Sequence, residues 1–431
     1  MKKLILILNI LISINLSLYS QNEVLQVFDG KDYNPVPWSE IEELGFDETE
    51  NLLHIFTETE DISIDADEKY FIPSGASIPL IEIITEEYLE EIPNKVDYKS
   101  GNFILKGFGV YEDIDTEVDI RGRGNSSWEF AKKPYRLKFD KKVSLCGLPK
   151  AKSYVLLANY SDCSLIQNSL AFEIGKMLEL PFTNRGIPVD VKLNGIYKGS
   201  YLLTNKPGIN SGSVDIDEDN SIMWELDVAY DEDYKFRSPL LDLPVMAVDP
   251  DLDDEKFEYW KNDFIEMEKA AIKGEASDLV DMDMLARYLL VYEVLKNDEI
   301  GWPKSVKLFK SKGEKYIFGP IWDFDTAMGK VWKSDAYTTD NIKEPVWKNR
   351  IISYLEEDSQ FKEAFKNHWG NIKNRLPEII DFIDSYSSTL YNSAIRNQML
   401  WRELEDFPTS VNKMKEWITL RFNALDQLYG H

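Results

Sequence analysis

Histidine and cysteine are scarce in this sequence, and their scarcity argues against several kinds of active site. The 431 residues include three histidines and two cysteines. The histidines are scattered, at His54, His368 and His431, which argues against a zinc site built mainly from imidazole ligands. No Gly-x-Ser-x-Gly segment is present, and neither cysteine has a histidine neighbour that suggests a nucleophile. Cys146 and Cys163 leave two possibilities open, a disulfide or two buried thiols.

Basic residues are also in deficit. The chain has 49 Lys and Arg against 76 Asp and Glu, a formal net charge of −27 at pH 7. This balance argues against binding to nucleic acid or to an anionic membrane surface, because both require a basic face. The negative net charge is still compatible with a local basic pocket that binds phosphates.

The one pronounced apolar stretch lies at the N-terminus. Lys2 and Lys3 precede a run from Leu4 to Leu18, and small Ser20 follows it, a pattern typical of a signal peptide over residues 1–20. The run is short for a bilayer span and contains polar residues. We therefore expect an exported bacterial protein, periplasmic, cell-surface or secreted, with no membrane span after signal removal.

The rest of the chain predicts an α+β fold in three parts. Residues 21–75 are acidic, with short alternating runs, and indicate an N-terminal β extension. Residues 76–250 are β-rich and contain one helix. Residues 251–431 are mostly helical.

Local signals place a few elements in this outline. Apolar residues from Leu165 to Met177 follow helical spacing, after Ser161-Asp162 as a candidate cap. Asn194-Gly195 predicts a hairpin turn between two strands. Asp283 is the expected cap of a later helix that ends at residues 297–299.

The segment Gly319–Gly329, of sequence GPIWDFDTAMG, carries two carboxylates one residue apart on a glycine-bounded turn. Asp323 and Asp325 can converge on one hard cation, because Mg²⁺ prefers oxygen ligands. A strand end with two solvated acids explains the segment alone equally well.

Two basic segments precede it. Arg121 and Arg123 lie in a Gly-rich turn after a strand, and guanidinium forks and free backbone amides suit phosphate oxygens. Arg136 and Lys138 share one face of a strand, and Lys138 would be a natural point charge for a nucleotide phosphate. A tight turn and an edge strand with ordinary surface charge are the alternatives.

Between these segments, Asp298 and Glu299 follow a helix end, where an acid can accept a proton from an attacking hydroxyl. The chain has first a basic strand, then an acid at a loop and then an acidic turn. This is the order in which kinase-like enzymes carry the phosphate-binding lysine, the base and the metal-binding aspartate. Acidic corners are also common without function. Paired carboxylates are numerous enough that a glycan hydrolase stays a third, weaker hypothesis.

These segments together make the sequence resemble the spore coat protein H (CotH) kinase family, a secreted, atypical branch of the protein-kinase-like fold. The similarity runs from about Ile78 to Leu428. Its longest motifs have the sequences RGRGNSSW (121–128), KPYRLKF (133–139), VLLANYSD (155–162), NSLAFE (168–173), GSYLLT (199–204) and GPIWDFD (319–325).

The resemblance implies binding of ATP and Mg²⁺ and phosphorylation of Ser or Thr in an extracytoplasmic protein. It implies that Lys138 contacts phosphates, that Arg121 and Arg123 belong to the turn covering the nucleotide, and that Glu173 pairs with Lys138. Asp298 would be the catalytic base, with Glu299 as the alternative that a subset of relatives suggests. Asp323 would be the main metal ligand, assisted by Asp325.

The sequence departs from the family pattern at three positions. Asn205 replaces the usual Glu, Gln167 replaces a frequent Arg, and Ser305 stands where a metal-ligating Asn is often found. These departures make a catalytically weak pseudokinase, acting as a cell-surface binding module for glycan or protein, the alternative function.

Overall fold

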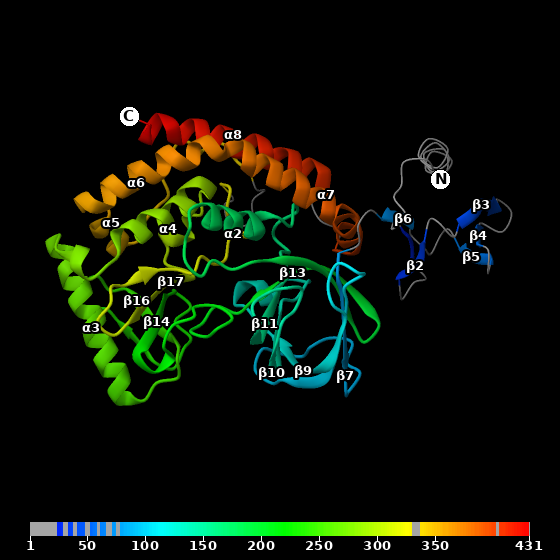
Figure 1. Cartoon of the computed structure of the whole chain (residues 1–431), viewed down its shortest axis with the longest axis horizontal. Helices are drawn as coiled ribbons and strands as arrows, with labels where there is room; N and C mark the ends of the chain where they lie inside the picture. The colour runs from blue at the N-terminus through cyan, green and yellow to red at the C-terminus, as the bar shows by residue number, and fades with distance from the viewer. Residues whose placement is uncertain are drawn as a thin grey trace.

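The computed structural model describes residues 78–329, 337–401 and 405–430, together with six short strands between residues 24 and 74. The expected signal peptide lies outside the described residues. A β-rich first half and a helical second half confirm the predicted α+β class (Figure 1). In the described part of the chain, no helix has the length and apolar character needed to cross a bilayer.

The six N-terminal strands form two antiparallel sheets of three strands each. One sheet has the order β2-β1-β6, and the other has the order β3-β4-β5. The bounds are β1 (Val24–Phe28), β2 (Tyr33–Pro37), β3 (Ile41–Asp47), β4 (Leu52–Thr57), β5 (Asp61–Asp65) and β6 (Phe71–Ser74).

The next part of the chain closes into a seven-stranded barrel, in the order β10-β11-β13-β12-β7-β8-β9. Its strands are β7 (Leu80–Thr85), β8 (Lys99–Lys106), β9 (Ile114–Gly122), β10 (Tyr135–Val143), β11 (Ala151–Leu157), β12 (Ile187–Leu193) and β13 (Ile196–Asn205). Alternate residues of β10, namely Tyr135, Leu137 and Phe139, are buried inside. Arg136 and Lys138 therefore share the outer face, as their spacing predicts.

The predicted hairpin and helix are both present. Asn194 and Gly195 have φ values of 51° and 81° between β12 and β13, as the hairpin turn requires. Helix α2 spans Gln167–Met177. Asp162 assists its start, because its carboxylate accepts a hydrogen bond from the Gln167 amide (2.9 Å).

A second sheet, in the order β15-β16-β14-β17-β18, lies beside the barrel (Figure 1). Its strands β14 (Ser221–Leu226), β15 (Lys235–Arg237) and β16 (Pro244–Asp249) come before residue 250, whereas β17 (Val306–Ser311) and β18 (Ile317–Phe318) come after it. The sheet thus joins the β-rich and helical parts of the sequence.

Helices cover this second sheet and extend over the barrel: α3 (Asp254–Lys273), α4 (Met282–Leu295), α5 (Arg350–Leu355), α6 (Ser359–Ile372), α7 (Leu376–Trp401) and α8 (Phe407–Tyr429). The cap expected at Asp283 is wrong, because Asp281 accepts the amide of Met284 and caps α4. Asp283 lies in the first turn instead, bonded to Arg287 and His368.

Helix α7 is tied to the barrel by buried polar contacts. Arg396 forms an ion pair with Asp190 of β12 at 2.5 Å. The side-chain oxygen Oδ1 of Asn397 accepts hydrogen bonds from the Ser200 backbone amide (3.0 Å) and from the Lys132 ammonium group (2.6 Å). These contacts connect the end of α7 to three separate barrel segments.

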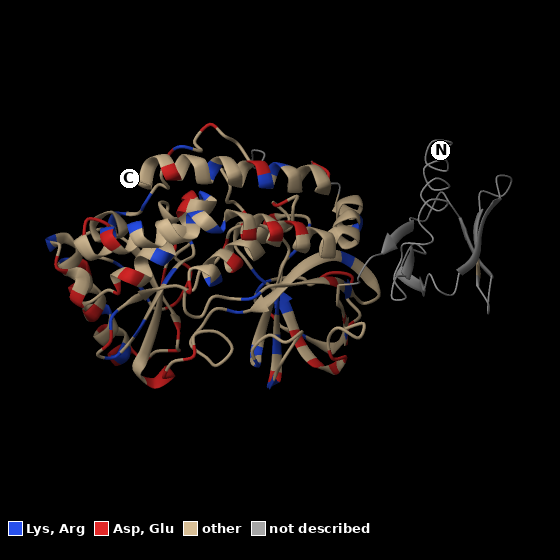
Figure 2. Cartoon of the chain, turned by 45° about the horizontal axis from the view of Figure 1, so that its top comes forward, with Lys and Arg blue, Asp and Glu red and all other residues tan. Residues whose placement is uncertain are grey.

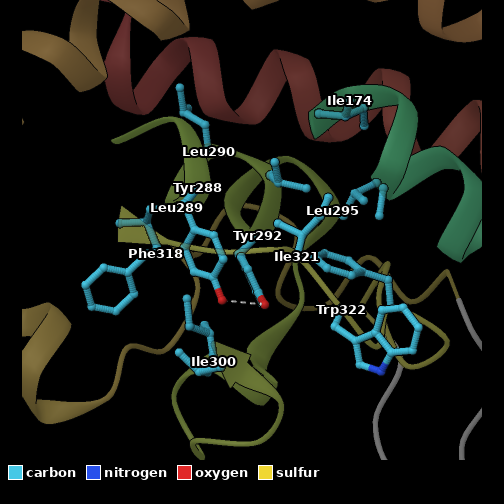
Figure 3. Close-up of a cluster of buried hydrophobic side chains, with 14 of the residues drawn as sticks. Ile174, Tyr288, Leu289, Leu290, Tyr292, Leu295, Ile300, Phe318, Ile321 and Trp322 are labelled. Carbon is cyan, nitrogen blue, oxygen red and sulfur yellow. Dashed lines mark hydrogen bonds between the residues drawn. The ribbon is translucent and has the colours of Figure 1, made fainter. Parts of the chain in front are cut away.

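The core of the helical part lies directly under the Asp323 segment (Figure 3). Tyr288 and Tyr292 of α4 bond to each other through their hydroxyls at 2.9 Å, and Ile321 and Trp322 pack into the same cluster. The segment that carries the two aspartates therefore rests on a packed apolar support.

Candidate functional site

A cleft of about 920 Å³ lies between the barrel and the second sheet. One wall comes from the barrel, including the Gly-rich turn at Arg123 and the apolar side chains of Val155 and Leu157. The opposite wall includes Asp323 and Asp325. Figure 2 shows Lys and Arg on the barrel strands of this strongly acidic chain.

The Asp323 segment has a fixed backbone. Asp323 has a φ of +66°, a conformation that non-glycine residues adopt at an energetic cost, and one that clusters at functional sites. The Asn297 side chain donates to its carbonyl oxygen (3.0 Å), and the Phe324 amide donates to buried Asn168 of α2 (2.9 Å). The Phe324 ring packs on Tyr292. The surroundings thus hold the strained residue in place.

The carboxylates of Asp323 and Asp325 interact with each other. Burial, followed by the negative charge of Asp323, raises the pKa of Asp325 to about 8. The Ser161 hydroxyl donates to Asp325 (2.9 Å), and the Ser305 hydroxyl lies 3.5 Å from Asp323. Asp325 therefore keeps its proton at neutral pH, and a cation bound between the two carboxylates would favour its release.

Three cations on the barrel side line the cleft: Arg123, Arg136 and Lys206. The charges of Asp323 and Asp325 act on Arg123, and those of Glu232 and Asp249 act on the other two. Burial lowers the pKa of each of the three cations. Among the residues that the structure describes, none of the three has a carboxylate within ion-pair distance. A half-buried cation outside ion-pair distance of the described carboxylates is costly, so this wall suits a bound anion.

The predicted pairing of Lys138 with Glu173 is not observed. Lys138 is exposed, stacks over the Tyr98 ring at 5.6 Å and does not line the cleft. Glu173 pairs with Lys176 of its own helix instead (3.3 Å). Arg136, two residues before Lys138 on the same strand face, reaches the cleft.

The two arginines of the Gly-rich turn differ. Both line the cleft, but the Arg121 guanidinium bonds to the carbonyl oxygen of Lys95 and stacks on Tyr98. Arg123 points its guanidinium toward Trp322, 5.8 Å from the ring, and interacts with the charges of Asp323 and Asp325. Only Arg123 keeps its charge available to the cleft.

Asp298 and Glu299 also differ in their surroundings. Asp298 binds Lys296 through both carboxylate oxygens (2.7 and 2.8 Å) and accepts the Trp347 amide, so both of its oxygens already accept hydrogen bonds. Glu299 pairs with Lys304, which lines the cleft (3.0 Å). Burial and the charge of Asp323 raise the pKa of Glu299. Glu299 is thus the acid coupled to the aspartate pair.

Several polar residues in the cleft were missed by the sequence analysis. Glu225 and Lys307 form an ion pair across β14 and β17, and Asp227 accepts the Ser305 amide (3.0 Å). Lys206 was missed although it follows Asn205, one of the positions that departs from the family pattern. A charged residue inside an otherwise apolar strand, as at Glu225, is the signal that could have found part of this set.

The two cysteines are thiols in separate environments. Cys146 is buried, whereas Cys163 lines the cleft, and no disulfide joins them. Burial raises the pKa of Cys146 to about 12.

Comparison with protein families matches residues 120–425 to the model described as CotH kinase protein. The chain belongs to the CotH kinase family. The match includes both walls of the cleft, from the Gly-rich turn at Arg123 to the Asp323 segment. A search of curated proteins found no match.

Proposed function

We propose that the protein is an atypical kinase that transfers the γ-phosphoryl group of ATP to Ser or Thr of a protein outside the cytoplasm. Membership of the CotH kinase family supports kinase chemistry. The family also implies a protein-kinase-like fold, in which the barrel and the helical part take the positions of the two lobes. The observation that carries the proposal is the cleft, which is lined both by three cations lacking described ion-pair partners and by two neighbouring carboxylates, Asp323 and Asp325.

Arg123, Arg136 and Lys206 are the groups that would bind the phosphates. Guanidinium groups bind phosphate oxygens in pairs and an ammonium group acts as a point charge, so the set suits a polyphosphate chain. The apolar part of the cleft, at Val155 and Leu157, would receive the base of the nucleotide.

Asp323 and Asp325 suit a divalent cation. Burial and the charge of Asp323 raise the pKa of Asp325, and a positive charge between the two carboxylates would lower that pKa and favour the ionised pair. In the part of the chain that the structure describes, no cluster of three or more His, Cys, Asp or Glu could hold a metal alone. Mg²⁺ commonly binds through one or two carboxylates plus substrate phosphates, and when bound it neutralises charge on the transferred group.

Glu299 is the proposed proton acceptor for the attacking hydroxyl. Its raised pKa brings it closer to neutral pH, which suits a general base. Asp298, which the family resemblance named as the base with Glu299 as the alternative, has its oxygens bound by Lys296 and the Trp347 amide. We therefore expect Glu299→Gln to abolish transfer and Asp298→Asn to reduce it less.

The deciding experiment combines thermal unfolding with transfer of labelled phosphate from ATP. We expect ATP with Mg²⁺ to raise the melting temperature of the wild type and of Asp140→Asn, an exposed acid outside the cleft. Asp323→Asn should lose both the shift and the transfer. A wild type that shows no shift at millimolar nucleotide contradicts the proposal.

A pseudokinase is the second candidate, and two positions favour it. Asn205 replaces an acid, and its side chain donates to the carbonyl oxygen of Pro149 (3.1 Å) rather than entering the cleft. Ser305 replaces a metal-ligating amide beside Asp323. A melting shift with ATP in the wild type but no phosphate transfer would select a binding module at the cell surface.

A further inference from the structure

A loop between β7 and β8, residues 91–98, adds a lysine to the lining of the cleft. This residue, Lys95, lies before residue 120, where the match to the CotH kinase family begins. Family membership therefore assigns no role to its side chain. Among the residues that the structure describes, no carboxylate lies within ion-pair distance of the Lys95 ammonium group. In a chain with 76 Asp and Glu residues, such a cation calls for an explanation.

The loop is fastened to the barrel without using the Lys95 side chain. The Gly122 amide donates to the backbone carbonyl oxygen of Asn94 (2.9 Å), and the Arg121 guanidinium group donates to the backbone carbonyl oxygen of Lys95. Within the loop, the side-chain oxygen of Asn94 accepts the Val96 amide (2.8 Å). All of these bonds use atoms that a substitution at position 95 leaves in place. The ammonium group is therefore not needed to hold the loop.

The ammonium group of Lys95 reaches the Gly-rich turn that carries Arg123. It donates to the carbonyl oxygen of Gly124 (2.8 Å) and, over a longer distance, to the side-chain oxygen of Asn125 (3.4 Å). Both acceptors are neutral, and an ammonium group has three N–H donors, so an anion would be a stronger partner. Among the described residues, the backbone amides of Gly124 and Asn125 donate to no acceptor. A cationic side chain beside free backbone amides suits phosphate oxygens.

We propose that Lys95 binds the phosphate chain of the nucleotide, together with Arg123 of the adjacent turn. The bond to Gly124 holds the ammonium group at the turn before the nucleotide arrives, which lowers the entropy lost on binding. The longer contact with Asn125 is the one that a phosphate oxygen would replace. This inference rests on the proposed kinase function, because it adds a phosphate ligand to the same cleft.

A purely structural role for Lys95 makes a different prediction. If the side chain only held the carbonyl oxygen of Gly124, an uncharged side chain with N–H donors would serve the same purpose. Glutamine has such donors but no charge, whereas arginine keeps the positive charge and can bind phosphate oxygens. Substitutions at position 95 can therefore separate the contribution of the charge from that of the hydrogen bond to the turn.

The test is isothermal titration calorimetry of the full protein with inorganic triphosphate and Mg²⁺, a probe that has no base or ribose. We expect saturable binding by the wild type, and a dissociation constant about tenfold higher in Lys95→Met and in Lys95→Gln, the effect of losing one charge-assisted hydrogen bond. Lys95→Arg should retain most of the affinity. Lys99→Met, which removes a lysine of the same barrel that pairs with Glu87 and does not line the cleft, should bind as the wild type does.

Three results would overturn the inference. The wild type could fail to bind triphosphate, Lys95→Met could bind it unchanged, or Lys95→Gln could bind it as the wild type does, which would assign the lysine to holding the turn. Melting temperatures of the unliganded variants, expected to equal that of the wild type, show that the fold is retained. The kinase function is tested separately. Triphosphate binding that depends on Lys95, without a melting shift for ATP and Mg²⁺, would contradict the kinase function while supporting the phosphate site.

Discussion

Lys206→Met is expected to weaken nucleotide binding without weakening the fold. Lys206 is half-buried, and burial together with the nearby charge of Arg136 lowers its pKa. No carboxylate of the described residues lies within ion-pair distance of it. In the protein without ligand its charge is therefore a cost, and replacing the ammonium group with a thioether should leave the free energy of unfolding equal or higher.

The effect on binding follows from the same geometry. A hydrogen bond to a charged group contributes about 1.5–3 kcal/mol, and losing one to a phosphate oxygen would raise the dissociation constant of ATP about tenfold to a hundredfold. Calorimetric titration with ATP and Mg²⁺ measures the affinity. Urea unfolding of the unliganded protein measures the stability.

Lys138→Met is the matched control. It makes the same substitution on an exposed lysine of the outer barrel face, above Tyr98 and outside the cleft. We expect neither affinity nor stability to change. The reasoning is refuted if Lys206→Met unfolds at lower urea while binding ATP normally, or if Lys138→Met weakens binding more than Lys206→Met does.

Three other outcomes are expected. At about pH 8, iodoacetamide should label Cys163 in the cleft, and ATP with Mg²⁺ should protect Cys163 from labelling. Buried Cys146, whose pKa is raised to about 12, should stay unlabelled. Mass spectrometry measures the labelling of both thiols. Equal labelling of both thiols would contradict the site. Asn168→Ala should lower the unfolding free energy by about 1–3 kcal/mol and weaken ATP binding, because the Asp323 segment loses its buried acceptor. Arg421→Met should lower the free energy of unfolding in urea by about 3–5 kcal/mol, because Glu293 stays buried without this partner. Adding Glu293→Gln should recover part of that loss. No recovery would mean that packing, not charge, dominates.

The sequence predicts elements where a local pattern determines them. Alternation of buried and exposed residues identifies the strand at Leu137, and an Asn-Gly pair identifies the hairpin at Asn194. Closure of the barrel depends instead on pairing between distant strands, β10 with both neighbours and β7 with β12 in parallel. No local signal encodes that pairing. The cap of α4 is a related case, because Asp281 and Asp283 are equally suitable by type.

The same distinction between local patterns and long-range strand pairing applies to the residues of the site. Asp323 and Asp325 were found because two acids in one short turn form a local pattern. Lys138 was favoured over Arg136 by residue type, since both share one strand face. The position along the strand decides which of them reaches the cleft, and β10 brings Arg136 level with Arg121 but Lys138 level with Asp119. Lys206 belongs to the site only because the barrel closes.

The contacts between α7 and the barrel limit how the cleft can open. Arg396 and Asn397 clamp the far end of this helix to β12, β13 and the segment at Lys132, while α7 also packs against α8 and α2. Helix α7 therefore connects the barrel to the helices α2 and α8. A wide rotation of the barrel away from the helices would have to break a buried ion pair. Substrate exchange should thus rely on small shifts of the loops at the mouth of the cleft.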